Sequence, residues 1–180
     1  MYAIADSLIS NNISPTLALG VVMLILVGLG FKVSVVPFHF WAPDVYQGAP
    51  TPVAGYLSTA SKAAGFAVIL RLFFIAIPEF ANNPEITNVW VMPLAVLAAV
   101  SMTVGNLLAL PQTNIKRLLA YSSISHAGYA MIGVVAFSQL GAASVIFYLA
   151  AYIATNLLAF GIVMAFSRVT GVEEITDYAG

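Results

Sequence analysis

Cysteine is absent from this sequence of 180 residues, and charged residues make up only 7% of it. The lack of cysteine excludes disulfides, thiolate chemistry and cysteine-ligated metal or iron–sulfur sites. The two histidines stand far apart in the sequence and form no cluster of metal ligands. There is also no phosphate-binding glycine loop and no HExxH motif, so an active site of the soluble-enzyme type is not expected.

Basic residues are as scarce as acidic ones, and six Lys or Arg against seven Asp or Glu give a net charge of −1. This balance argues against nucleic-acid binding, which needs a basic stripe. Hydrophobic residues are abundant at 61%, and the mean hydropathy is +0.98. Because the apolar stretches repeatedly reach about 20 residues, the sequence predicts an all-α, polytopic transmembrane helix bundle.

Five membrane spans are expected within a single membrane domain over residues 1–180. Polar or proline-rich segments separate them, such as APDVYQGAPTP at 42–52 and PQTN at 111–114. The expected spans cover about residues 15–41 (broken at Pro37), 53–77, 89–110, 115–137 and 144–168. An odd number of spans and a polar end suggest a piece of a longer chain.

Cations gather on the side of the 42–52 loop, where Lys116, Arg117 and Arg168 flank the turns. The positive-inside rule places this side in the cytoplasm or its equivalent. Arg117 is interpreted as a topology anchor, whereas Lys116 is undecided between an anchor and a proton relay. Thr113 or Asn114 is expected to cap the helix that begins there.

Two further lysines fall well inside the expected spans. Lys32 precedes the break at Pro37, and Lys62 lies deep in the second span. At 1.5 Å per residue, both amines lie roughly 8–15 Å into a hydrocarbon layer about 30 Å thick. A lysine at the centre costs about 2.5–3.5 kcal/mol on insertion scales, so we expect both to face a cavity or a partner. The alternative is a side chain that snorkels from an ordinary packing face.

Small and hydroxyl-bearing residues surround Lys62 at helical spacing. Gly55, Ser58, Thr59 and Gly65 share its helix face. Small residues let neighbouring helices approach closely, and hydroxyls can hold water or form hydrogen bonds across the gap. The pattern predicts that Lys62 points into the bundle.

Pro37 has no N–H to donate to the carbonyl of Val33, and its ring clashes there, so the helix is expected to open next to Lys32. In lipid, a freed carbonyl is tolerated only against protein or a water-filled cavity, and transporters use such broken helices in ion sites. Alternatively, Pro37 ends the span at the interface, where Trp41 joins an aromatic belt. The sequence leaves both interpretations open.

Polar residues also follow helical spacing in the later spans. They are Thr103 and Asn106 on the third span, Ser122, Ser125, His126, Tyr129 and Gly133 on the fourth, and Tyr148, Tyr152 and Thr155 on the fifth. A histidine among hydroxyls suits a hydrated proton path, because imidazole titrates near neutral pH. The alternative for His126 is a hydrogen-bonded packing residue.

Two stretches, GFKVSVVPFHFWAPDVYQGAPTPVAGYLSTASKAAGF and GNLLALPQTNIKRLLAYSSISHAGYAMIGV, resemble the antiporter-like membrane subunits of proton-pumping NADH–quinone oxidoreductase, or respiratory complex I. The resemblance covers about residues 28 to 168. The motif VPFHFWAPDVYQGAPTPV resembles the subunit N branch more than its paralogues L and M or the Mrp-type antiporters.

This resemblance implies a 14-helix antiporter-like fold, of which the chain matches helices 7 to 11. Lys32 then matches the lysine of a discontinuous helix, with Pro37 as the structural break, and Lys62 matches the connecting lysine of the next helix. Lys116 and His126 match polar links on helix 10. All four residues are implied members of a proton relay. The family's glutamate on helix 5 and lysine on helix 12 fall outside this sequence.

The function implied is that of a proton-translocating subunit of an enzyme, in which quinone is reduced by other subunits. NAD, FMN, iron–sulfur clusters and quinone would be bound elsewhere in the complex, with no cofactor or metal on this chain. The implied partners are other membrane subunits, the lipid bilayer, protons and water, in the bacterial plasma membrane. A stand-alone Mrp-type sodium/proton antiporter and a non-transporting membrane scaffold are the alternatives.

Overall fold

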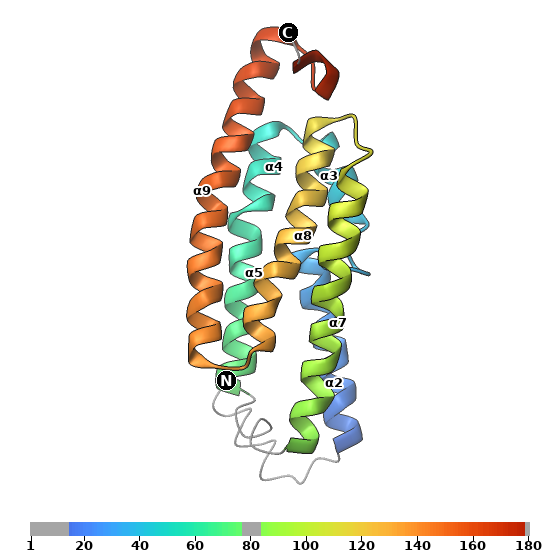
Figure 1. Cartoon of the computed structure of the whole chain (residues 1–180), viewed down its shortest axis with the longest axis vertical. Coiled ribbons are helices and arrows are strands. Elements are labelled where there is room, and N and C mark those ends of the chain that lie inside the picture. The colour runs from blue at the N-terminus through green and yellow to red at the C-terminus, as the bar shows by residue number, and fades with distance from the viewer. Residues whose placement is uncertain (1–14, 77–83, 179–180) are drawn as a thin grey trace.

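The computed structural model describes residues 15–76 and 84–178, which form a bundle of helices (Figure 1). The elements in chain order are α2 (Pro15–Val33), α3 (Trp41–Gly48), α4 (Thr51–Ser58), α5 (Ala60–Arg71), the π-helical η1 (Leu72–Ala76), α7 (Pro84–Ala109), α8 (Ile115–Val135), α9 (Gln139–Thr170) and the 3₁₀ turn η2 (Ile175–Tyr178). The described residues contain no strand, only an isolated bridge between Asn114 and Glu174. The predicted all-α bundle is confirmed.

Four helical segments in the described part of the chain are long and apolar enough to cross a membrane. They cover Thr51–Phe74, Val91–Ala109, Ile115–Val135 and Gln139–Thr170, and α2 adds a shorter apolar stretch, Met23–Val33. Each lies at one of the five expected positions. The last helix begins before and ends after the expected 144–168.

The 42–52 segment differs from the turn that the sequence predicted, because residues 41–48 form α3. Pro43 lies in the first turn of this helix, where a missing N–H leaves no intrahelical hydrogen bond unmade. A true turn is left only around Ala49 and Pro50. Short as it is, α3 buries Ala42 and Tyr46, and it packs against α8.

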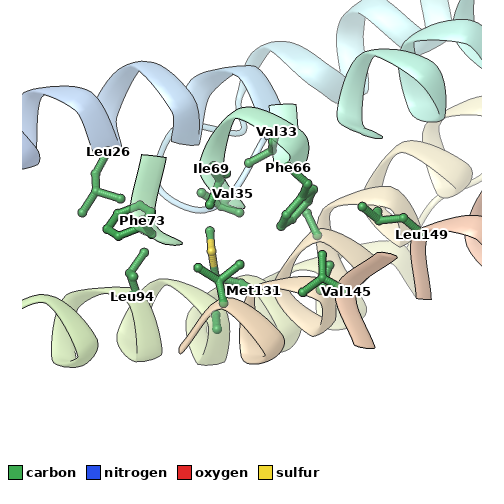
Figure 2. Packing of buried hydrophobic residues seen from close by; sticks show 14 residues of the cluster. Leu26, Val33, Val35, Phe66, Ile69, Phe73, Leu94, Met131, Val145 and Leu149 are labelled. Carbon is green, nitrogen blue, oxygen red and sulfur yellow. The ribbon is translucent and has the colours of Figure 1, made fainter. Parts of the chain in front are cut away.

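The hydrophobic core lies where α2, α5, α7, α8 and α9 meet (Figure 2). Leu26, Phe66, Leu94, Met131 and Val145 each contribute a buried side chain, one from each of these helices. The helix α8 contacts α7, α9, α3, α4 and α5, so it is the centre of the bundle. A polar side chain that points into this centre must therefore reach α8.

Two glycines let α7 and α8 approach each other closely. A Cβ atom at Gly105 would lie 2.6 Å from the backbone nitrogen of Ser125, and one at Gly128 would lie 2.8 Å from the carbonyl oxygen of Ala98. Both obstacles are backbone atoms, which cannot rotate away. Small residues at this contact are typical of helix pairs packed in membranes.

One end of the bundle holds the start of α8, the end of α9 and the short α3 (Figure 1). The cations Lys116, Arg117 and Arg168 all lie at this end, as the sequence predicted. The segment after α9 returns to the turn before α8, where Ile175 N donates to Thr113 O at 2.8 Å and Ile115 N donates to Glu173 O at 3.0 Å.

Candidate functional site

Lys62 lies in the first turn of α5 and is buried, with 2% of its surface exposed. Its ammonium group donates a hydrogen bond of 2.5 Å to the backbone carbonyl oxygen of Ser123 in the middle of α8. Within the described residues no carboxylate forms an ion pair with it. A single hydrogen bond leaves two of the three ammonium protons for other acceptors, so this amine has the capacity to contact water.

A break in the helix comes directly before Lys62 and was not predicted from the sequence. The hydroxyls of Ser58 and Thr59 both donate to the carbonyl oxygen of Gly55, at 2.9 Å and 2.7 Å. These side chains compete with the helical hydrogen bonds of the backbone. As a result α4 ends at Ser58, and α5 begins at Ala60. The predicted inward face is confirmed, because Gly55, Ser58, Thr59, Lys62 and Gly65 are all buried.

Lys32, at the end of α2, is exposed on the surface of the chain, in contrast to the expected burial. Its stem packs against α5, because a Cβ atom at Gly65 would lie 3.5 Å from Lys32 Cγ. Gly65 is one helical turn after Lys62. The two lysines therefore lie at similar heights, but the described part of the chain encloses only Lys62.

The segment around Pro37 packs against α7, although Pro37 itself is exposed. The helix α2 ends at Val33, Val36 and Pro37 are joined by a cis peptide bond, and Val36 N donates to the hydroxyl of Ser101 at 2.9 Å. Ser101 is fully buried on α7. Two carbonyl oxygens near the end of α2 accept hydrogen bonds: Trp41 Nε1 donates to Phe31 O at 2.9 Å, and Val35 N donates to Gly30 O at 3.0 Å.

Both interpretations of Pro37 end a helix near this residue, and α2 indeed ends at Val33, with α3 beginning at Trp41. The chain continues through the loop into α3 and so reaches the end of the bundle that carries the cations (Figure 1). Trp41 caps a carbonyl of α2.

His126 sits on α8 in a cluster of tyrosines. Its Nδ1 and the hydroxyl of Tyr148 form a hydrogen bond of 2.5 Å. The imidazole ring lies 5.0 Å from the ring of Tyr152 and 5.7 Å from that of Tyr129, measured between centroids. The Tyr129 hydroxyl in turn accepts a hydrogen bond of 2.9 Å from Asn106 on α7. The polar stripes of three expected spans thus meet around His126.

Ser123 lies three residues before His126 on α8 and contacts Lys62. Its carbonyl accepts the Lys62 hydrogen bond, and its hydroxyl lies 3.5 Å from the hydroxyl of Tyr46. Tyr46 is fully buried on α3 and was not identified from the sequence. Its aromatic ring packs edge-on against Phe160 of α9, which fixes its position.

Lys116 lies at the cation-rich end, away from these groups. Its amine forms an ion pair of 2.8 Å with Glu173 and donates to the carbonyl of Ala49 at 3.1 Å. The residue therefore ties α8 to the α3–α4 connection and to the segment after α9. Glu173 was not among the predicted site residues.

Arg117 forms an ion pair of 2.5 Å with Asp44 on α3, and the side chain of Asn114 accepts hydrogen bonds from the backbone N–H groups of Lys116 and Arg117. Asn114 is thus the cap that was predicted for this helix.

Tyr178 lies at the same end of the bundle, and its ring stacks on that of Phe166. Burial and the nearby charge of Glu173 raise the pKa of Tyr178.

No cluster of three or more His, Asp or Glu in the described residues is arranged to hold a metal ion. Around Lys62 and His126 the described bundle offers an amine, an imidazole and several hydroxyls. Groups of these types can donate and accept protons.

The sequence was compared with known proteins. Residues 2–180 match a family described as the NADH:quinone oxidoreductase/Mrp antiporter transmembrane region. NADH-quinone oxidoreductase subunit N 2 of Chloroherpeton thalassium is 50% identical over 182 residues, which cover 100% of this chain and 35% of that protein. NAD(P)H-quinone oxidoreductase subunit 2 of Thermosynechococcus vestitus is 48% identical over 178 residues. The matched region covers 99% of this chain and 33% of that protein.

Solved structures show the same likeness. A chain of respiratory complex I from Thermus thermophilus with bound aureothin aligns with a TM-score of 0.65 and 47% identity, over 82% of this chain and 30% of that one. A chain of the membrane-bound sulfane sulfur reductase, an archaeal respiratory membrane complex, aligns with a TM-score of 0.81 and 26% identity. That alignment covers 98% of this chain and 36% of the other. The chain spans about a third of the length of the curated relatives that it matches. It belongs to the NADH:quinone oxidoreductase/Mrp antiporter transmembrane family.

Proposed function

We propose that this chain forms the central part of a proton path in a proton-translocating membrane subunit of NADH–quinone oxidoreductase. The observation that carries the proposal is the buried amine of Lys62, which is held by a carbonyl and has no carboxylate partner in the described residues. An uncompensated amine inside a membrane is expensive and marks an ion or proton pathway. The names of the relatives cited above support the choice of enzyme.

In this proposal Lys62 receives a proton from the side of Lys32 and passes it through water towards His126. Lys32 is close enough to share the α5 face around Gly65. Its exposed amine would be enclosed by a part of the longer protein or by another membrane subunit. Reduction of quinone takes place in other subunits, which also hold NAD, FMN and iron–sulfur clusters, and it drives the relay by changing the charge near Lys32.

Lys116, which the sequence left undecided, takes the role of an anchor. Its ion pair with Glu173 and its hydrogen bond to Ala49 O use the amine for contacts at the end of the bundle. A relay group must release its proton in every cycle, and release here would leave the carboxylate of Glu173 without its ion-pair partner. The proton path therefore runs through Lys32, Lys62 and His126.

The two alternatives make different demands on the same residue. A stand-alone sodium/proton antiporter would use Lys62 without peripheral subunits, and a scaffold would not use it at all. Co-purification of the full-length protein with redox subunits distinguishes the enzyme from the antiporter.

The test of the proposal is Lys62→Ala in the full-length protein within its complex. We expect assembly to remain intact and proton translocation coupled to quinone reduction to fall by about 100-fold or more, the typical contribution of one acid–base group. Unchanged proton translocation at an intact level of assembly would favour the scaffold and overturn the proposal.

A further inference from the structure

The helix α2 ends in a closed loop of backbone hydrogen bonds around Lys32. Val35 N donates to Gly30 O at 3.0 Å, and Ser34 N donates to Phe31 O at 3.2 Å. These two bonds form the pattern of a Schellman motif, and the φ of 61° at Ser34 is the left-handed conformation that this motif uses. Lys32 lies between the donor and the acceptor of both bonds, so its backbone is joined firmly to the segment that follows α2.

On one side the end of α2 is held against α5. A Cβ atom at Gly65 would lie 2.6 Å from Val33 Cγ1 and 3.5 Å from Lys32 Cγ, so the two helices touch at this glycine. Val33 is fully buried there. Gly65 lies about one helical turn after Lys62, so the contact brings Lys32 to the height of Lys62. It fixes the end of α2 on the α5 side only.

On the other side the segment after α2 is held against α7. The N–H group of Val36 donates to the hydroxyl oxygen of Ser101 at 2.9 Å. Ser101 is fully buried. Val36 carries the last N–H group before Pro37, which has none of its own to donate. The bond to Ser101 therefore holds the helix break that follows Lys32 against α7.

We propose that Ser101 is a positioning residue for the proton path, whose hydroxyl fixes the helix break on α7 and thereby sets the place of Lys32 beside Lys62. The inference rests on the proposed function, because it assumes that protons pass between the two lysines. Proton transfer depends steeply on the distance and orientation of its partners. With the Gly65 contact on one side and the Ser101 bond on the other, Lys32 keeps one separation from Lys62.

A purely structural bond would have a different effect. If the hydroxyl of Ser101 only stabilised the fold, its loss would lower the amount of assembled complex and leave each assembled complex working normally. If it positions Lys32, its loss slows proton translocation in complexes that are fully assembled. The rate of translocation divided by the amount of assembled complex therefore separates the two roles.

The test is Ser101→Ala in the full-length protein within its complex, with Ser144→Ala as the matched control. Both changes remove one hydroxyl oxygen from a helix, but Ser144 is exposed on α9 and donates to Leu140 O of its own helix. A misplacement of about 1 Å can cost about 100-fold in rate. Because the Gly65 contact remains, we expect Ser101→Ala to slow translocation per assembled complex about ten-fold and Ser144→Ala to leave it unchanged.

Two further variants keep an acceptor at this position. Ser101→Thr retains the hydroxyl and should restore most of the rate. Ser101→Cys replaces the oxygen by a weaker acceptor of similar size, so its rate should lie between those of alanine and serine. If the alanine variant does not assemble, the cysteine variant decides, and a normal rate per assembled complex in it would overturn the inference.

Other outcomes are equally clear. Slow translocation in Lys62→Ala with a normal rate per complex in Ser101→Ala would overturn this inference and leave the proposed function standing. Threonine and alanine variants that are equally slow, or an equal loss in Ser144→Ala, would also overturn it, because the hydrogen bond would then not be the cause. Normal rates in both Lys62→Ala and Ser101→Ala would remove the proposed function as well.

Discussion

The amine of Lys116 and the carboxylate of Glu173 lie 2.8 Å apart, joining the first turn of α8 to the segment that follows α9. The lysine side chain is 6% exposed and the glutamate side chain 30%. Because the pair is shielded on one side, its loss leaves a nearly buried ammonium group with only the carbonyl of Ala49. Removing one partner of such a pair is therefore more destabilising than removing one partner of a pair in open solvent.

We expect Glu173→Gln to destabilise the protein by about 1.5–3 kcal/mol, the usual range for a hydrogen bond to a charged group. The measurement is the thermal unfolding midpoint of the purified full-length protein in detergent. Glu174→Gln is the matched control, because Glu174 is exposed and forms no side-chain ion pair in the described structure. Equal midpoints for the two variants would contradict the anchoring role of Lys116.

The ion pair between Arg117 and Asp44 should contribute much less, although its atoms are closer. The side chain of Asp44 is 73% exposed, so solvent screens the attraction. Asp44→Asn is expected to change the free energy of unfolding by less than about 1 kcal/mol. If Asp44→Asn lowered the free energy of unfolding as much as Glu173→Gln does, the pair of Arg117 and Asp44 would have to be shielded from solvent in the assembled protein.

Gly65→Ala should separate α2 from α5. The new Cβ atom would lie 2.6 Å from Val33 Cγ1, and the fully buried, stiff valine has no room to give way. Overpacking of this kind costs about 1–3 kcal/mol. Gly28→Ala serves as the control in thermal unfolding, since nothing lies within 4 Å of its added atom. Alanine is expected to be neutral or slightly stabilising there.

Asn114→Ala removes both side-chain hydrogen bonds at the start of α8. We expect a loss of about 1 kcal/mol in the free energy of unfolding. Asn114→Ser keeps an acceptor at this position and should recover most of the loss. A result in which alanine and serine destabilise equally would mean that the cap contributes through packing.

Hydrophobic patterning predicts most of this fold, because long apolar stretches and proline-rich separators locate the helices directly. The break before Lys62 could not be read in the same way. The residue at the break is Thr59, which is neither of the usual helix breakers, proline and glycine. The break arises because the hydroxyls of Ser58 and Thr59 both donate to the carbonyl oxygen of Gly55. The helix α3 was missed for the opposite reason: Pro43 indicates a turn, but it occupies a helical position that tolerates proline.

The sequence provided candidates for the site but not their contacts. The inward direction of Lys62 follows from the small residues on its helix face, whereas Glu173 and Tyr46 become partners only when the helices are assembled. The exposure of Lys32 shows the same limit. Whether a side chain is enclosed depends on neighbours that helical periodicity does not specify.

The most direct measurement is the rate of proton uptake by proteoliposomes that contain the intact complex with Lys62→Met in the full-length protein. Methionine fills a similar volume without an ionisable group, so the interior stays packed while the amine is lost. Our account predicts that proton uptake falls by about 100-fold while the complex stays assembled. Proton uptake at the normal rate in that variant would contradict it.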